Sequence, residues 1–284
     1  MQGKIVKAHS NFYYVLPNNG IKAVKCVARG VFKIKKTDLV VGDLVEFENN
    51  VITNVLKRRN LFIRPSVSNV DVVAIVVSFE PFPDYNLVDK LIINAGIACA
   101  DKIIIINKID ENNDIVDYIY ANYLNCVEKI YTVSAKTGEG IEQLKSYIKG
   151  KTVVLAGQSA VGKTSIINNV FGFQLKTGEV SEKIARGKHT TTYSSIYQEN
   201  DIVVIDSPGF AVIDANVDKD EIKDYYPEFA KYLNCCRFRG CSHVNEPDCA
   251  IKIAVSNGEI SKDRYQRYLE IYNETEKRGK NYGK

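Results

Sequence analysis

The order of three short motifs constrains the fold of this chain more than any other feature. A segment that fits the pattern G-x4-G-K-[ST] occupies residues 157–164 with the sequence GQSAVGKT. The tetrapeptide NKID precedes it at residues 107–110, and DSPG follows it at residues 206–209. In most proteins with all three motifs, the G-x4-G-K-[ST] segment comes first and N-K-x-D comes last. The order here predicts a circularly permuted domain, in which the strands keep their places in the sheet although the chain enters it elsewhere.

The segment at residues 157–164 is typical of a phosphate-binding loop. The apolar stretch KTVVLAG leads into it and a helical pattern follows it, which is the context that such a loop requires. Glycines allow backbone N–H groups to surround phosphate oxygens, and the N-terminus of the next helix adds positive potential. We expect Lys163 to reach the terminal phosphates and the hydroxyl of Thr164 to bind Mg²⁺.

The NKID motif indicates that the base is guanine. A carboxylate at Asp110 can accept hydrogen bonds from N1–H and the exocyclic amine of guanine, which adenine does not offer in that arrangement. Lys108 is expected to lay its methylene groups over the base. The tripeptide SAK at residues 134–136 follows the next predicted strand and is expected to offer a backbone N–H to guanine O6. We therefore predict that the ligand is GTP rather than ATP.

The DSPG motif is expected to complete the magnesium site. Asp206 ends a predicted strand and is expected to hold Mg²⁺ directly or through water, while the N–H of Gly209 senses the terminal phosphate. Because this segment runs directly into a cysteine-rich region, we expect that region to move or dock with the nucleotide state.

Candidate catalytic residues are less well defined. Phe210 stands where many GTPases have a glutamine that orients water, so slow intrinsic hydrolysis is expected. The segment GKHTTT at residues 187–192 occupies the place of the first switch loop, and we expect Thr191 to close on Mg²⁺. His189 either positions the attacking water as a neutral imidazole or is an exposed loop histidine. The predicted catalytic residues are Lys163, His189 and Thr191.

Four cysteines crowd between residues 235 and 249, which favours a metal site over disulfides in a reducing compartment. Cys236, Cys241, His243 and Cys249 offer three thiolates and an imidazole, the set typical of a closed structural zinc site. Cys235 competes for a ligand position, but the spacing favours Cys236. The alternative is a group of buried free thiols beside a core histidine.

Three regions differ in pattern, and we predict three domains. Residues 1–62 read as about five short strands, which suggests an OB-like barrel, with an SH3-like barrel as the alternative. Residues 63–214 alternate apolar strands with helices, as in a mainly parallel α/β sheet. Residues 215–284 are helical and contain the cysteines. We expect the aromatic face of a helix near residues 262–277 to pack in a core, and the basic tail after it to be a disordered RNA contact.

Charge is distributed unevenly although the net charge is only +4. Residues 1–64 contain twelve Lys or Arg and four Asp or Glu, so the remainder of the chain is slightly acidic. This balance favours a front module that binds a polyanion, with a lysine-rich solvated surface as the alternative. No apolar run is long enough to span a bilayer and the first residues lack a signal-peptide core, so we expect a cytoplasmic protein.

Taken together, these motifs resemble the RsgA (YjeQ/YloQ) family of circularly permuted GTPases that depend on the small ribosomal subunit. The strings GKHTTT and CRFRGCSHVNEPDCA are much more specific to this family than the general GTPase motifs are. The resemblance implies a late assembly factor whose GTP hydrolysis the small subunit stimulates. The resemblance also implies that residues 107–110 and 157–165 bind GTP and that zinc lies on Cys236, Cys241, His243 and Cys249. With the residues argued above, the expected GTP-binding set is Asn107, Lys108, Ile109, Asp110, Ser134, Ala135, Lys136, Gly157, Gln158, Ser159, Ala160, Val161, Gly162, Lys163, Thr164, Ser165 and Gly209, and Mg²⁺ is expected on Thr164, Asp206 and Thr191.

One position departs from this family. Ala160 stands where glycine is usual, which is tolerable if the backbone φ there is negative. The expected partners are GTP or GDP and the small subunit with its rRNA, and the protein is expected to be monomeric. The alternative function is a nucleotide-gated RNA-binding module with little turnover. A permuted GTPase acting on the large subunit or on a protein client is less compatible with a basic barrel and a zinc module.

Overall fold

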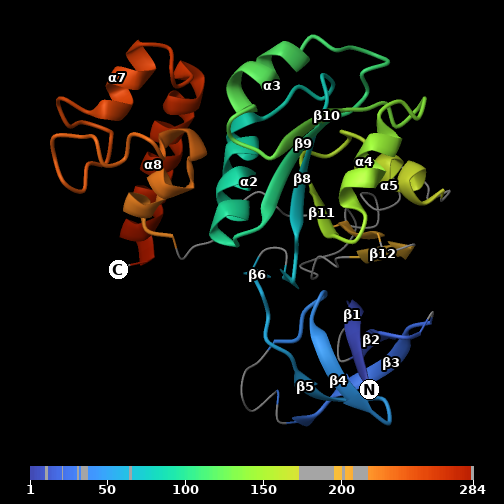
Figure 1. Ribbon diagram of the computed structural model, residues 1–284. Coiled ribbons are helices and arrows are strands. Elements are labelled where there is room, and N and C mark those ends of the chain that lie inside the picture. The colour runs from blue at the N-terminus through green and yellow to red at the C-terminus, as the bar shows by residue number, and fades with distance from the viewer. Residues whose placement is uncertain are drawn as a thin grey trace.

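The computed structural model consists of a barrel, a central sheet flanked by helices, and a helical module beside one of these helices (Figure 1). The structure describes residues 1–9, 12–20, 22–30, 32, 38–63, 66–172, 195–199, 202–206 and 217–282. Among these residues, no helix is both long and apolar enough to cross a membrane.

The first five strands close into a barrel with the order β1-β2-β3-β5-β4. The strands are β1 (Gln2–His9), β2 (Phe12–Pro17), β3 (Val24–Ala28), β4 (Leu44–Glu48) and β5 (Val51–Val55). Alternate side chains fill the interior: Ile5, Val15, Cys26, Val45, Phe47 and Ile52 are buried. Strand β3 pairs in parallel with β5, which gives the connectivity of an OB-fold rather than an SH3-like barrel. The prediction of an OB-like barrel is therefore confirmed.

A six-stranded sheet forms the central domain, in the order β10-β9-β8-β11-β13-β12. All neighbours pair in parallel except β12, which is an antiparallel edge strand. The strands are β8 (Val72–Val77), β9 (Asp101–Ile106), β10 (Lys129–Thr132), β11 (Thr152–Ala156), β12 (Ser195–Glu199) and β13 (Ile202–Asp206). Strand β8, the first of them in the chain, lies inside the sheet between β9 and β11. The chain therefore builds the sheet outwards from an interior strand, as the permuted motif order predicts.

Helices cover both faces of this sheet, as Figure 1 shows. Helices α2 (Tyr85–Ile97) and α3 (Val116–Tyr123) pack with Val73, Ile75 and Val77 of β8. Helices α4 (Ile141–Ile148) and α5 (Lys163–Phe171) pack with Val72, Ala74 and Val76, which point to the other face. Because both faces are buried, the strands are continuously apolar rather than alternating.

The C-terminal module packs against α2 and contains the cysteine cluster. It consists of the 3₁₀ helices η1 (Lys219–Tyr225) and η2 (Pro227–Phe229) and the α-helices α7 (Ala250–Ser256) and α8 (Lys262–Tyr282). The helical stretch predicted at its start forms two short 3₁₀ helices, and the chain is extended between them at Tyr226, because a following proline disfavours helical backbone at that residue. Helix α8 continues to Tyr282 through most of the tail that was expected to be disordered. Its face formed by Tyr265, Tyr268, Leu269 and Tyr272 packs in the core of the module, as predicted.

The barrel lies at the amino ends of the central strands. A short hairpin of β6 (Leu61–Phe62) and β7 (Val67–Ser68) joins it to β8. Lys4 Nζ of the barrel donates to Thr152 Oγ1 at the start of β11, at 3.3 Å. The predicted domain limit at residue 62 coincides with the end of β6, and the limit at residue 214 lies outside the described residues, so the domain limits stay predictions.

Candidate nucleotide site and metal centre

Three of the predicted nucleotide motifs follow the carboxyl ends of strands in the parallel part of the sheet. NKID follows β9 and SAK lies just beyond its neighbour β10, while the phosphate loop follows β11, which β8 separates from β9. Loops at the carboxyl ends of parallel strands meet at one edge of a sheet, which is where such folds bind ligands. This edge is opposite the one to which the barrel is attached.

The phosphate loop has the backbone that its glycines allow. Gly157 has φ +131°, and a Cβ there would lie 2.2 Å from the carbonyl oxygen of Val76. Gly162, with φ +92°, caps the start of α5. Lys163 Nζ donates to the carbonyl oxygens of Gly157 at 2.8 Å and Gln158 at 2.5 Å. The lysine ammonium is therefore held beside the loop in which phosphates would be bound.

Ala160 does not have the negative φ that would make an alanine tolerable at this position. Its φ is +65°, in the left-handed region, and not negative. A residue with a Cβ pays about 1–2 kcal/mol there relative to the right-handed region. The loop keeps this conformation because its neighbours fix it: Val161 is buried, and its carbonyl oxygen accepts a hydrogen bond from Asn107.

Asn107 joins three loops of the site. Its Nδ2 donates to the carbonyl oxygen of Val161 at 2.9 Å, and its Oδ1 accepts the N–H of Ala135 at 3.0 Å. A Cβ on Gly162 would lie only 2.3 Å from Asn107 Nδ2, so glycine is required for this approach. Asn107 is buried and connects NKID with both SAK and the phosphate loop. The fold thus brings together NKID, SAK and the phosphate loop, which are separated in the sequence.

Asp110 is oriented by the SAK segment. Ser134 Oγ donates to Asp110 Oδ1 at 2.5 Å, and Lys136 Nζ lies 3.8 Å from Asp110 Oδ2. The hydrogen bond from Ser134, aided by the charge of Lys136, lowers the pKa of the Asp110 carboxyl group. At neutral pH the carboxylate is therefore charged and can accept donors of a base.

Lys108 and Gln158 make contacts that the sequence patterns do not predict. Lys108 has φ +64°, and its Nζ donates to the carbonyl oxygen of Glu80 at 2.7 Å. The side chain of Gln158 forms hydrogen bonds with the backbone of Phe82 and Asp84, in the segment between Glu80 and α2. This segment, residues 80–84, belongs to no nucleotide motif, and its composition gave no signal of a role at the site.

The remaining predicted nucleotide residues are only partly described. Thr164 and Ser165 lie in the first turn of α5. Asp206 ends β13, and its backbone is in register with Leu155 of β11, just before the phosphate loop. The predicted residues Gly209, His189 and Thr191 lie outside the described residues, as does Phe210.

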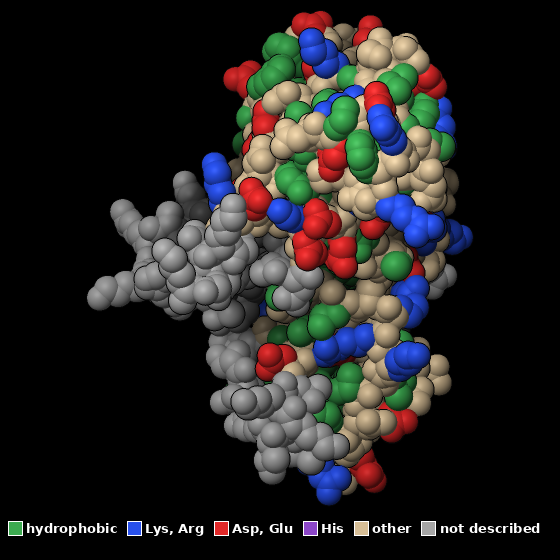
Figure 2. Space-filling view, turned by 90° about the vertical axis from the view of Figure 1, so that its left-hand side faces the viewer, with side chains coloured by type: hydrophobic (Ala, Val, Ile, Leu, Met, Phe, Trp, Pro, Cys, Tyr) green, Lys and Arg blue, Asp and Glu red, His purple; other side chains and the backbone are tan. Residues whose placement is uncertain are grey.

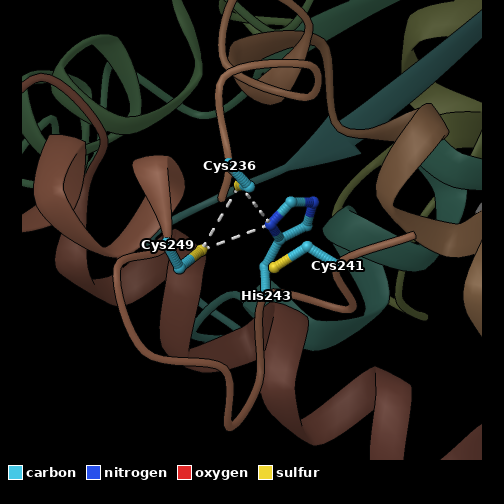
Figure 3. A group of neighbouring side chains, drawn as sticks. All are labelled: Cys236, Cys241, His243 and Cys249. Carbon is cyan, nitrogen blue, oxygen red and sulfur yellow. Dashed lines mark hydrogen bonds between the residues drawn. The ribbon is translucent and has the colours of Figure 1, made fainter. Parts of the chain in front are cut away.

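The four predicted metal ligands form a compact cluster (Figure 3). The ligand atoms of Cys236, Cys241, His243 and Cys249 all lie within 4.8 Å of one another. His243 Nδ1 is 3.5 Å from Cys236 Sγ and 3.3 Å from Cys249 Sγ, and these two sulfur atoms are 3.9 Å apart. Cys235 is exposed and its thiol donates to the carbonyl oxygen of Lys231 instead.

The three pairs of atoms at 3.3–3.9 Å are close to the ligand spacing around a tetrahedral zinc ion, and the cluster as a whole is somewhat wider, within 4.8 Å. Zn–S bonds of about 2.3 Å and Zn–N bonds of about 2.0–2.1 Å place neighbouring ligands about 3.6–3.8 Å apart. Burial raises the pKa of the Cys241 thiol to about 12, so a cation is what would keep this thiol deprotonated. Burial also lowers the pKa of His243 to about 4, which leaves its imidazole neutral and able to bind metal.

Side chains outside the ligand set hold the ligand loop. Glu246 accepts the N–H of Ser242 at 2.7 Å and its hydroxyl at 2.8 Å. Burial by itself would raise the pKa of Glu246, but these hydrogen bonds outweigh it and lower the value to about 2. Tyr265 Oη donates to the carbonyl oxygen of His243 at 2.8 Å, and Tyr268 Oη donates to that of Ser242 at 2.5 Å. The spacing of the tyrosines predicts only that they pack in a core, and no sequence pattern identifies Glu246.

Comparison with known protein families gives two matches along the chain. Residues 2–54 match the RsgA N-terminal domain, and residues 55–216 match the RsgA GTPase. Proteins named small ribosomal subunit biogenesis GTPase RsgA are similar over nearly their full length. The one from Caldanaerobacter subterraneus is 39% identical, with 99% of this chain and 97% of that protein covered. The one from Agathobacter rectalis is also 39% identical, with 99% of this chain and 100% of that protein covered.

Two solved structures are similar as well. YjeQ from Thermotoga maritima matches with a TM-score of 0.82 and 35% identity over 96% of this chain and 98% of that one. The circularly permuted GTPase YloQ matches with a TM-score of 0.77 and 30% identity over 98% of this chain and 95% of that one. The permuted arrangement inferred from motif order is thus found in a protein described in those terms.

Proposed function

The chain belongs to the RsgA family of circularly permuted GTPases, and from this premise we propose that it is a GTP-hydrolysing assembly factor of the small ribosomal subunit. The relatives named above are biogenesis GTPases of that subunit. In this role the protein would bind GTP, engage rRNA of the maturing subunit in the cytoplasm as a monomer, and leave after hydrolysis.

The observation that carries the nucleotide part of the proposal is the position of Asn107. Its side chain bonds to the phosphate loop through Val161 and to SAK through Ala135. The charged Asp110 carboxylate, bonded to Ser134, then lies on the base side of the same assembly. A purine with two adjacent donors satisfies that carboxylate, whereas a purine without them leaves it unpaired.

Mg²⁺ and the chemistry of hydrolysis are assigned to residues on the phosphate side. We infer that Thr164 and Asp206 hold Mg²⁺ together with Thr191, and that Lys163 binds the terminal phosphates. The hydrolysed bond joins the β- and γ-phosphates. With Phe210 after the DSPG motif, water positioning falls to His189 or to the ribosomal subunit, which is consistent with hydrolysis that the subunit stimulates.

Zinc is assigned a structural role at Cys236, Cys241, His243 and Cys249. Four protein ligands fill a tetrahedron and leave no position for substrate. Tyr265 of α8 holds the ligand loop by donating a hydrogen bond to the carbonyl oxygen of His243. Zinc would therefore shape the surface that the module offers to RNA, without taking part in hydrolysis.

Two surfaces support rRNA binding. On the barrel, Lys25 Nζ lies 3.8 Å from the centre of the Phe12 ring, and Phe12 is 40% exposed. An exposed aromatic ring beside lysines suits stacking on bases and contact with phosphates. In Figure 2, Lys and Arg side chains occur on both the zinc module and the barrel below it, with Asp and Glu between them. Because charges of both signs are mixed on this face, the exposed Phe12 ring beside Lys25 is the stronger support for RNA binding.

The proposal is tested by two measurements. In the first, wild type should bind GDP far more tightly than ADP in a fluorescence titration, and Asp110→Asn should lose at least about a hundredfold of that preference. Glu111→Gln is the matched control, because Glu111 is an exposed neighbouring carboxylate. Equal binding of GDP and ADP by wild type would refute the nucleotide assignment.

The second measurement is phosphate release from GTP with and without small ribosomal subunits. Stimulation by small subunits, and not by large ones, is expected. A rate unchanged by small subunits would favour the alternative of an RNA-binding module that acts by nucleotide occupancy alone. Stimulation by large subunits only would refute the proposal, because the protein would then act on the large subunit.

A further inference from the structure

A side chain of the phosphate loop bonds to the amino terminus of helix α2. Gln158 Oε1 accepts the N–H of Asp84 at 2.9 Å, and its Nε2 donates to the carbonyl oxygen of Phe82 at 3.2 Å. Asp84 is the N-cap residue of α2, and its Oδ1 accepts the N–H of Leu87 at 3.0 Å. Gln158 therefore joins the phosphate loop to the capped N-terminus of α2.

The backbone of the same glutamine holds the phosphate-binding lysine. Lys163 Nζ donates to the carbonyl oxygen of Gln158 at 2.5 Å. Lys108 Nζ donates to the carbonyl oxygen of Glu80, in the same segment that forms hydrogen bonds with the Gln158 side chain. The phosphate side and the base side of the site are thus both bonded to residues 80–84.

Helix α2 packs on the zinc module along its length. Asp89 of α2 is completely buried and accepts Arg267 Nε of α8 at 2.8 Å. One residue further, Lys90 Nζ lies 2.6 Å from a carboxylate oxygen of Glu274, also on α8. Ile93 belongs to the hydrophobic core of the zinc module itself. A displacement at the start of α2 is therefore delivered to α8, because the two helices are joined by buried contacts.

Resting on the proposed function, we propose that Gln158 is a positioning residue that couples nucleotide binding at the phosphate loop to α2 and, through it, to the zinc module. A bound phosphate competes with the Gln158 carbonyl oxygen for Lys163. When Lys163 leaves that carbonyl oxygen, the Gln158 backbone can move. The side-chain amide of Gln158, which bonds to Phe82 and Asp84, then displaces the N-terminus of α2. This route is separate from the segment after Asp206 that connects covalently to the module.

The experiment compares Gln158→Ala with Gln143→Ala, in which an exposed glutamine of α4 is removed. Two hydrogen bonds at a partly exposed position predict about three- to tenfold weaker GDP binding for Gln158→Ala and no change for Gln143→Ala. Gln158→Glu keeps the acceptor for Asp84 N–H but places a carboxylate beside the carbonyl oxygen of Phe82 and the phosphate loop, so it should bind GDP no more tightly than Gln158→Ala.

Hydrogen exchange of the full chain provides the readout of coupling. At saturating GDP, wild type should show slower amide exchange in the phosphate loop and in residues 84–97 and 262–272. In Gln158→Ala the phosphate loop should still respond, whereas α2 and α8 should respond much less. Equal protection of α2 and α8 in both proteins, or unchanged GDP affinity, would overturn the inference.

These results are distinguishable from failure of the proposed function. Gln158→Ala should keep the preference for GDP over ADP, because Asp110 is untouched. If wild type itself lacks that preference, the nucleotide assignment fails. If wild type has it and α2 responds to GDP without Gln158, only the coupling role fails.

Discussion

The two junctions that flank the central domain are built differently. At the barrel junction, Arg59 pairs with Asp71 while its side chain is 61% exposed, and Lys4 reaches Thr152. At the junction with the zinc module, Arg264 and Asp89 are 1% and 0% exposed and lie 2.5 Å apart. The ion pair of Arg59 at the barrel junction is largely exposed on its arginine side, although Asp43 beside it is buried and accepts Arg58 and Ser68, whereas the other junction is a buried network of charges that spans the two domains.

This difference sets how each module can move. Exposed ion pairs contribute about 0–1 kcal/mol each, so the barrel can shift at small cost in these pairs. Breaking a buried pair leaves an uncompensated charge and costs about 3–5 kcal/mol. Movement of the zinc module with the nucleotide state would therefore carry α2 with it, because Asp89 is part of that helix.

The largest effect is expected from removing a zinc ligand. Cys249→Ser should abolish stoichiometric zinc binding and unfold the module, because binding energies of structural zinc are about 10–16 kcal/mol in isolated zinc fingers. Metal analysis and circular dichroism measure this. Cys235→Ser, at the exposed neighbouring cysteine, should leave both unchanged. A folded Cys249→Ser protein without zinc would show that the junction, and not the metal, organises the module, and one that still holds zinc would show that Cys249 is not a required ligand.

Asp89→Asn tests the buried junction directly. The variant leaves Arg264 and Arg267 without their shared carboxylate, and we expect about 3–5 kcal/mol of destabilisation in urea unfolding. Arg59→Met at the barrel junction should cost less than about 1 kcal/mol. Equal costs for the two variants would break the contrast between the junctions.

The pH dependence of the barrel junction offers a smaller effect. Burial alone would raise the pKa of Asp71, but its hydrogen bonds with Arg59 and the N–H of Thr152 outweigh burial and lower it. A lowered folded-state pKa gives stability that is present above the unfolded value of about 3.9 and is lost as pH falls through the folded value. The stability difference between wild type and Asp71→Asn should thus be constant near neutrality and shrink below about pH 4. A difference that grows on acidification would contradict this sign.

The smallest effect is expected at Ala160, which lies in neither junction. Ala160→Gly relieves a positive φ but also loosens the unfolded chain, so we expect a gain of about 0.5–1 kcal/mol at most. Thermal unfolding measures it, and both junction variants should show their own costs unchanged in this background. Destabilisation by glycine would mean that the alanine methyl group makes a contact that outweighs the strain.

Features set by local sequence could be predicted, and features set by distant pairs could not. The phosphate loop and cysteine spacing lie within a few residues, so their chemistry is visible in the sequence. Asp89 and Arg267 are 178 residues apart and follow no periodic pattern, so the junction became visible only with the fold. The φ of Ala160 depends on the packing of its neighbours, and the roles assigned to His189 and Thr191 stay predictions.

The interior position of β8 has a consequence for biosynthesis. It can pair with β9 soon after leaving the ribosome, but its other partner, β11, begins at Thr152 and emerges much later. Until then the nascent chain presents an unpaired apolar strand edge, the kind of surface that invites wrong pairing. The NKID motif at residues 107–110 is translated before the phosphate loop at residues 157–164. A nucleotide that needs both segments can therefore stabilise the chain only after the phosphate loop has been made.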